Sequence, residues 1–231
     1  MFDIIVTGLA TAVAVTATPQ GDRLKPMDQC FTIYRRGAEG DVPIGTTRQV
    51  IRAVRVEGKA AWDIVVHQRV PMAKFAMRDH FVLNRADLLP IGFDNRRSGV
   101  EHVALRYAPG RITGTRTEAG APVAIDVAAS APVWEGNLWG VTFGALPLAA
   151  DQRFTLPFYQ YDSGLGSFTL SVMGSQSVET PTGAVQAWVV AVEKDGKPSA
   201  TALIAQDDGR ELGSYGARGG TRLGGDCSGL D

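Results

Sequence analysis

The side chains best suited to acid–base chemistry in this sequence are three histidines, His67, His80 and His102. Each lies in a segment where apolar and polar residues alternate, which is typical of a strand with one buried face. Because side chains alternate between the two faces of a strand, all three imidazoles are predicted on the less apolar face. An imidazole gains and loses a proton near neutral pH. We therefore take the three histidines, with the phenol of Tyr161, as candidate catalytic acids or bases.

Each histidine has an arginine on the same predicted face, two or four positions away: Arg69, Arg78 and Arg106. The same alternation of side chains places only one lysine, Lys74, and one carboxylate, Asp63, on these faces. Clustered cations without acids repel one another unless a ligand offsets their charge. If the three strands are neighbours, we expect a pocket for a negative or ionisable oxygen, with Arg78 and Arg106 binding the ligand. The alternative is a solvated convex surface. The segments carry no acidic motif for a three-histidine metal site, and we predict no metal.

Aromatic residues gather between positions 134 and 161, and residues 134–146 form the one segment of helical character. Small-molecule pockets are mostly apolar with a few polar groups, so these rings are candidates for a pocket wall. The alternative is ordinary packing in the core. The rings predicted to bind a ligand are Trp134, Trp139, Phe143, Phe158 and Tyr159.

Turns rich in glycine, proline and aspartate separate a dozen segments of strand character, with almost no helical periodicity. This pattern predicts an all-β, mainly antiparallel fold: a highly curved meander that forms an incomplete barrel around a short helix or loop plug at residues 134–146. No shift in composition marks a second domain, so residues 18–231 are predicted to form one β half-barrel with a glycine-rich tail at 213–231. The predicted strands are 30–36, 44–57, 61–70, 73–84, 100–107, 111–118, 122–127, 152–161, 167–176, 184–193, 199–206 and 210–215.

Residues 4–17 form an uncharged apolar stretch, too short for a transmembrane span but typical of a secretory signal. A small-x-small pattern at its end predicts a signal peptide over residues 1–17 and a periplasmic or otherwise exported protein. Asp3 stands where such a signal carries positive charge. It favours the alternative, in which this stretch is a strand or helix of a cytoplasmic protein.

The two cysteines, Cys30 and Cys227, lie 197 positions apart. In an exported protein an even count this small predicts one disulfide, which would anchor the glycine-rich tail to the start of the fold. In a cytoplasmic protein the alternative is two free buried thiols.

The formal net charge of −1 and the isoelectric point near 6.3 give the chain no basic field for nucleic acid. The sequence has no phosphate-binding loop, no His-Glu-x-x-His pair, no Cys-x-x-Cys pair and no glycine-flanked serine. We therefore predict no cofactor, no nucleic-acid partner and no transmembrane span, and the oligomeric state stays open.

Several pieces of the chain combine strands with proline or glycine turns, at residues 42–45, 84–90, 103–110, 146–157 and 178–188. Across about residues 29–216 these pieces resemble a family of uncharacterised proteobacterial envelope proteins, whose fold is shared with the periplasmic lipoprotein carrier. The resemblance implies a curved incomplete barrel, a concave and partly apolar cavity, and an envelope location. It supplies no catalytic residues.

Two functions of different classes follow. The first is an envelope protein that binds a small apolar or amphiphilic molecule, lipid-like or aromatic, in the half-barrel cavity. The alternative is a cofactor-independent lyase, isomerase or hydrolase that acts on a small aromatic substrate through its histidine, arginine and tyrosine groups. A histidine inside an enclosed cavity would favour the enzyme, and a bare convex histidine face would favour the binding protein.

Overall fold

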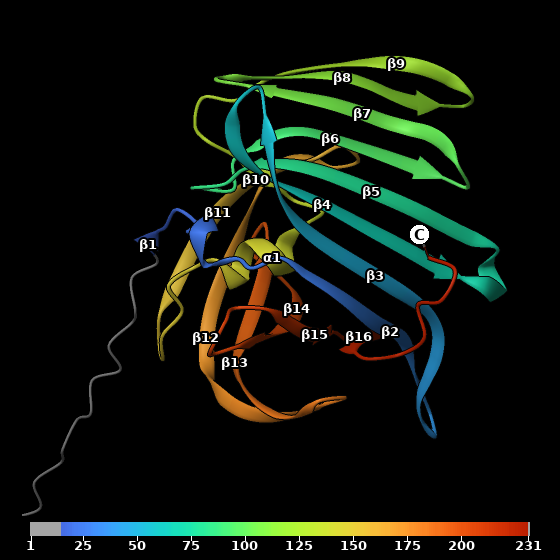
Figure 1. Cartoon of the computed structure of the whole chain (residues 1–231), viewed down its shortest axis with the longest axis vertical. Coiled ribbons are helices and arrows are strands. Elements are labelled where there is room, and N and C mark those ends of the chain that lie inside the picture. The colour runs from blue at the N-terminus through green and yellow to red at the C-terminus, as the bar shows by residue number, and fades with distance from the viewer. Residues whose placement is uncertain (1–14, 231) are drawn as a thin grey trace, which may run out of the picture.

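The computed structural model describes residues 15–230, which form one sixteen-stranded sheet with a single short α-helix among them (Figure 1). The sheet order is β1-β11-β12-β13-β14-β15-β16-β2-β3-β4-β5-β6-β7-β8-β9, and β10 also pairs with β11. The paired strands are antiparallel, except that β1 and β10 each run parallel to β11. The elements are β1 (Val15–Thr16), η1 (Gly21–Arg23), β2 (Met27–Gly37), β3 (Gly40–Val56), β4 (Lys59–Val70), η2 (Pro71–Ala73), β5 (Phe75–Asn84), β6 (Pro90–Arg97), β7 (Val100–Ala108), β8 (Arg111–Glu118), β9 (Ala121–Ala128), β10 (Trp134–Glu135), α1 (Trp139–Gly144), β11 (Arg153–Gln160), β12 (Gly164–Thr180), β13 (Gly183–Lys194), β14 (Lys197–Ala205), β15 (Glu211–Tyr215) and β16 (Gly219–Leu223).

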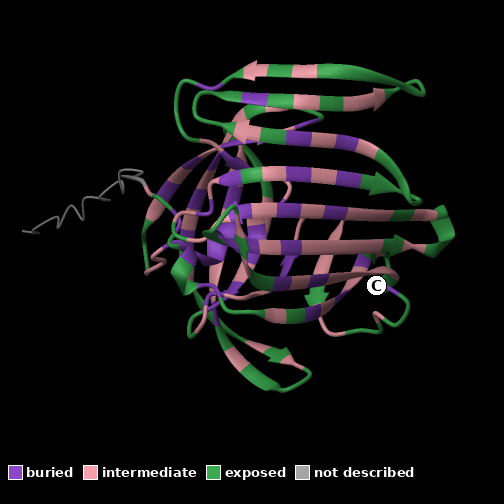
Figure 2. Ribbon diagram, turned by 45° about the horizontal axis from the view of Figure 1, so that its top comes forward, coloured by how far each residue is buried: buried purple, intermediate pink, exposed green. Residues whose placement is uncertain are grey.

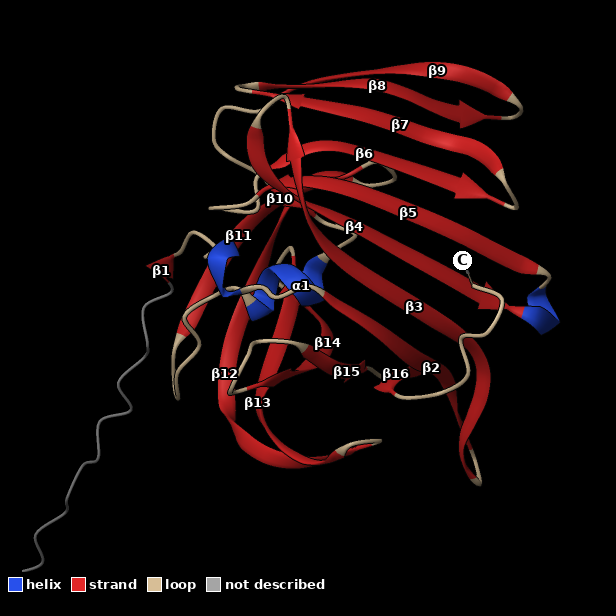
Figure 3. Cartoon of the chain, viewed as in Figure 1, coloured by secondary structure: helices blue, strands red, loops and turns tan. Residues whose placement is uncertain are grey.

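Two arms of the sheet, β3 to β8 and β11 to β14, share one hydrophobic core. The helix α1 lies between them (Figure 3). Phe143 of α1 contacts Phe168 of β12, with ring centroids 5.4 Å apart. Phe93 of β6 stacks on Tyr161, which follows β11, at 5.8 Å. Figure 2 shows buried and exposed residues alternating along many of the strands, as expected where one face of a sheet packs on a core.

The all-β, mainly antiparallel fold with one short helix is confirmed. The number of strands is higher than expected, chiefly because β6 and β16 were not predicted. β6 ends in the polar run Asn95–Arg97 and contains a bulge at Ile91, and β16 lies in the glycine-rich tail, so neither has a clear apolar alternation. The sheet is open, because within the described residues β9 pairs with β8 alone and does not return to β11.

The predicted helical segment at residues 134–146 is helical only over Trp139–Gly144, and its first two residues form β10 instead. Glycine is required where this helix crosses the turn between β14 and β15. A Cβ atom at Gly144 would overlap the carbonyl oxygen of Gly209, and one at Gly140 would overlap the carboxylate of Glu211. The helix therefore packs with its backbone directly on that turn.

The predicted disulfide is confirmed: Cys30 and Cys227 are bonded, with Cα atoms 5.8 Å apart. The tail is also held by β16, which pairs with both β15 and β2. A disulfide of this kind indicates an oxidising environment, as in exported proteins. Residues 1–14 of the predicted signal peptide lie outside the described residues. Among residues 15–230 no helix has the length and apolarity that crossing a membrane requires.

Candidate functional site

His67 and His80 lie on the same face of neighbouring strands β4 and β5, as predicted. This face, which we call the outer face, is opposite to the fully buried core residues Ile64 and Phe81. On it, His67 is directly opposite Arg78 in the strand register.

His80 is held between two aspartates of the outer face. Its Nε2 lies 2.6 Å from Asp63 Oδ1, and its Nδ1 lies 2.7 Å from Asp94 Oδ2. Each ring nitrogen of His80 therefore lies within hydrogen-bonding distance of a carboxylate oxygen. Arg78 donates to Asp94 (2.9 Å), and Arg52 lies 3.8 Å from Asp63. Neither ring nitrogen of His80 is open to a substrate in this arrangement, and the two carboxylates lie on opposite sides of the ring.

Asp94 is a second carboxylate on the histidine–arginine face. The histidine–arginine face was expected to carry a single carboxylate, but the unpredicted strand β6 adds Asp94 between His80 and Arg78. The cations of this part of the face are therefore partly compensated by the protein itself.

Replacing His80 by glutamine is expected to lower the free energy of unfolding by about 1–2 kcal/mol, because one neutral amide cannot satisfy two carboxylates. The side chains of His80, Asp63 and Asp94 are 24%, 23% and 29% exposed, so water screens part of the loss. Urea unfolding at pH 6 measures the effect. His102→Gln is the matched control and should change stability less. Equal stability of His80→Gln and the parent would contradict a stabilising role for this network.

His102 does not join the other two histidines. β6 separates β7 from β5, and the register of β6 and β7 shifts at a bulge in β7 that contains His102. The His102 ring meets the ring of Tyr161 edge-on, with centroids 5.8 Å apart. Burial, together with the positive charges of Arg97 and Arg116, lowers the pKa of His102. The predicted three-histidine face depended on neighbouring strands, and it does not form.

Tyr161 is buried against the core end of this arrangement. Arg97 donates to its hydroxyl (3.2 Å), and Arg116 donates to its carbonyl oxygen. Burial raises the pKa of the Tyr161 phenol, and the Arg97 hydrogen bond opposes that rise. Tyr161 and His102 thus form a second cluster with two arginines, on a different part of the molecule from His80. The catalytic roles assigned to these residues stay predictions.

The two other arginines of the predicted face make separate contacts. Arg106 is exposed on β7, opposite Gly92 of β6. Arg69 donates to the carbonyl oxygen of Ser228 in the tail (3.3 Å).

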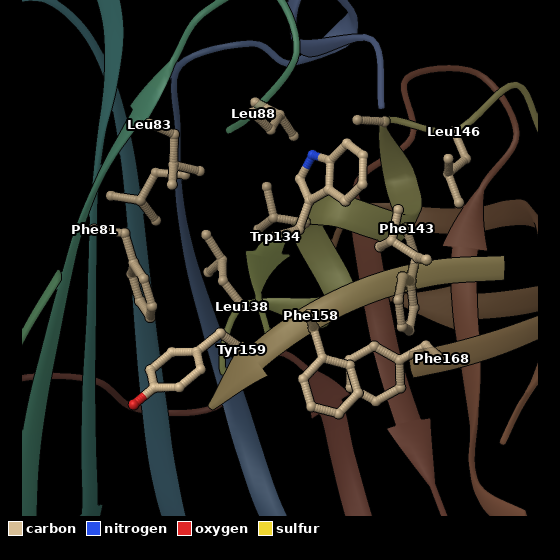
Figure 4. Close-up of a cluster of buried hydrophobic side chains, with 14 of the residues drawn as sticks. Phe81, Leu83, Leu88, Trp134, Leu138, Phe143, Leu146, Phe158, Tyr159 and Phe168 are labelled. Atoms are coloured by element: carbon tan, nitrogen blue, oxygen red, sulfur yellow. The ribbon is translucent and has the colours of Figure 1, made fainter. Parts of the chain in front are cut away.

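Four of the predicted ligand-binding rings pack in the core (Figure 4): Trp134, Phe143, Phe158 and Tyr159. The fifth, Trp139, is partly buried against this core. Phe158 lies on Phe168 of β12, with centroids 4.2 Å apart, and Trp139 packs on Phe143 at 5.5 Å. The indole of Trp134 donates to the carbonyl oxygen of Asp87 (2.9 Å).

A pocket of about 430 Å³ lies elsewhere, where β7 turns into β8 and the chain leaves β9. Its lining is mostly apolar and differs from the predicted rings. The sequence analysis placed Asn84, Tyr107 and Ile112 in predicted strands and left most of the lining outside them. The apolar run 131–133 between two strands was the available signal. The lining residues are Asn84, Leu89, Pro90, Ile91, Tyr107, Ala108, Pro109, Gly110, Ile112, Ala129, Ser130, Ala131, Pro132 and Val133.

Tyr107 gives this pocket its aromatic wall. Its hydroxyl donates to Glu135 (2.5 Å), a carboxyl that is 3% exposed and outside the lining. Glu135 also accepts hydrogen bonds from the backbone and side-chain nitrogens of Asn137. Burial raises the pKa of Glu135 to about 7. The hydrogen bond to Glu135, which lies outside the lining, thus fixes the Tyr107 side chain while the Tyr107 ring lines the pocket.

The model of a protein family of unknown function, DUF3108, matches residues 30–213. The chain belongs to the DUF3108 family. No curated protein and no solved structure matches the chain. The DUF3108 match covers the whole pocket and all three histidines, whereas Cys227 and the segment after β15 lie beyond it.

Proposed function

We propose that this protein binds a small apolar or amphiphilic molecule outside the cytoplasm, in the pocket lined by Tyr107 and Ile112. The observation that carries the proposal is the mostly apolar pocket of about 430 Å³ at the end of β7 and β8. Pockets of roughly 300–1,000 Å³ with a few polar groups are typical of small-ligand sites. We propose that the two arms of the sheet act as an incomplete barrel, whose end opens into this pocket.

The balance of polar and apolar groups favours an amphiphile. Ile112 and Ala129 form a buried apolar base, while Asn84 and Ser130 supply polar groups. Tyr107 contributes its ring rather than its hydroxyl, because the hydroxyl is bonded to Glu135. An acyl chain or an aromatic ring therefore suits the base, with a small polar end at the rim.

The disulfide and the resemblance to envelope proteins support a location in the periplasm or another exported compartment. The alternative, a cofactor-independent enzyme, is less well supported, because none of the three histidines lines this pocket.

Binding of N-phenyl-1-naphthylamine, an apolar probe whose fluorescence rises in apolar surroundings, tests the proposal. Ala131→Trp should weaken probe binding about tenfold or more, because the indole would fill the pocket. Ala131 is an exposed lining residue, so the larger side chain need not disturb the core.

Ala124→Trp is the matched control, since Ala124 is exposed on β9 and outside the lining. Decanoic acid should displace the probe from the parent and from this control. Unchanged probe affinity in Ala131→Trp would rule out the pocket as the binding site.

A further inference from the structure

The described residues that line the apolar pocket include no charged side chain. Three arginines adjoin lining residues in the chain, but each lies outside the lining. Arg85 lies over an indole ring of the core (4.9 Å to the centroid), and Arg111 donates two hydrogen bonds to Asp126 (2.7 and 2.6 Å). Arg106 and Tyr107 are consecutive in β7, so their side chains lie on opposite faces of the strand. The lining therefore offers no cation to an anionic ligand.

Two carboxylates are hydrogen-bonded to lining residues from outside the lining. Glu135 accepts from the Tyr107 hydroxyl and from the backbone and side-chain nitrogens of Asn137. Asp87 Oδ1 accepts from the backbone amide of Leu89 (3.0 Å). Because like charges repel, these carboxylates disfavour an anionic ligand when they are ionised. Because neither belongs to the lining, a cationic ligand in the pocket has no lining carboxylate with which to pair.

Asn84 brings hydrogen-bond donors to the lining. Its Oδ1 accepts from the Ala86 amide (2.9 Å), and this bond orients the side-chain amide. Asn84 Nδ2 has no hydrogen-bond partner within the described part of the chain. A side-chain NH₂ group donates two hydrogen bonds and accepts none. An oxygen that only accepts hydrogen bonds is therefore the ligand atom that suits Asn84 best.

We infer that the ligand of this pocket is an uncharged amphiphile, whose polar end is an oxygen that accepts a hydrogen bond from Asn84 Nδ2. This inference rests on the proposed function, since it names the class of ligand that the apolar pocket binds. Burying a charge without a partner costs far more than burying a carbonyl oxygen that accepts a hydrogen bond. Long-chain ketones and esters have such an end, whereas fatty-acid anions and alkylammonium ions carry a charge there.

Displacement of N-phenyl-1-naphthylamine by 2-decanone, decanoate and decyltrimethylammonium tests the preference. At pH 8 the carboxyl of decanoic acid is ionised, because the ordinary pKa of a carboxyl is about 4. The three ligands then have similar chains and differ in the charge of the polar end. 2-Decanone should displace the probe from the parent at a concentration about tenfold lower than either ion. Displacement by either ion at the same or a lower concentration would overturn the inference.

Asn84→Asp separates the hydrogen bond from the general apolarity of the ligand. Aspartate keeps an acceptor for the Ala86 amide, removes the two Nδ2 donors and places a carboxylate in the lining. The variant should bind 2-decanone about tenfold more weakly than the parent, because a carboxylate cannot donate to a ketone oxygen. It should bind decyltrimethylammonium more tightly than the parent does.

Gln176→Glu is the matched control, because it makes the same change of amide to carboxylate at an exposed position of β12, outside the lining. It should leave the affinities for 2-decanone and decyltrimethylammonium unchanged. Equal affinity of Asn84→Asp and Gln176→Glu for 2-decanone would also overturn the inference.

The filled pocket of Ala131→Trp distinguishes failure of this inference from failure of the proposed function. If an ion displaces the probe best from the parent and Ala131→Trp weakens its binding, the pocket remains the binding site and only its assignment to uncharged ligands is wrong. If none of the three ligands displaces the probe, or if Ala131→Trp binds all of them as the parent does, both proposals are wrong.

Discussion

Removing the disulfide by Cys30→Ser and Cys227→Ser together should lower the free energy of unfolding by ~4–5 kcal/mol. The bridge joins positions 197 residues apart, so its loss greatly enlarges the conformational freedom of the unfolded chain. The folded state loses less, because β16 still pairs with β2 and the carbonyl oxygen of Cys30 still accepts from the Gly224 amide (2.7 Å).

Urea unfolding of the double variant, and of the parent with and without reductant, measures this effect. Ser228→Ala is the control, because it changes the tail beside the bridge without breaking it. A loss below ~1 kcal/mol would mean that strand pairing alone closes the loop. Reduced parent and double variant should agree, since both lack the same bond.

Turn chemistry predicted most of the strands well, because hairpin turns with glycine or proline mark strand ends locally in the sequence. β6 was missed because Pro90 and Gly92 at its start and the polar residues at its end hide the alternation. That single omission had consequences for the site. It hid Asp94, whose carboxylate lies within hydrogen-bonding distance of His80. It also hid the position of β6 between β7 and the strands that carry His67 and His80.

The alternation of side chains along each strand correctly placed His67 and His80 on the same face of the sheet, because this alternation is a local property of a strand. It failed for His102, because a bulge depends on how two strands pair and has no local signal in this segment. The apolar pocket depends in the same way on distant segments, because Ala131 and Tyr107 meet only once the chain beyond β9 folds back.

Buried carboxyls should make the protein more stable near pH 5 than at pH 8. Burial raises the pKa of Asp79 to about 6, against the opposing effect of its hydrogen bond from Asn95, and raises the pKa of Glu135 to about 7. Burial alone raises the pKa of Glu211 to about 7, where its carboxylate lies under Gly140 of α1.

In each case the folded protein holds its proton more tightly than the unfolded chain. Stability from these groups is therefore full below about pH 4 and is lost as the pH rises through 6 to 7. One pKa unit corresponds to about 1.4 kcal/mol, so a net fall on the order of 3 kcal/mol is expected between pH 5 and 8. Salt-bridged Asp28, whose hydrogen bond with Arg48 lowers its pKa, acts in the opposite direction and only at more acidic pH.

Glu211→Gln isolates one of these carboxyls, because the amide keeps the shape of the side chain and cannot ionise. The variant should be more stable than the parent at pH 8, and its stability should change less between pH 5 and 8. Glu179→Gln, at an exposed position of β12, should follow the parent at both pH values. Urea unfolding at several pH values between 4 and 8 gives the comparison. A parent whose stability rises over this range would contradict the prediction.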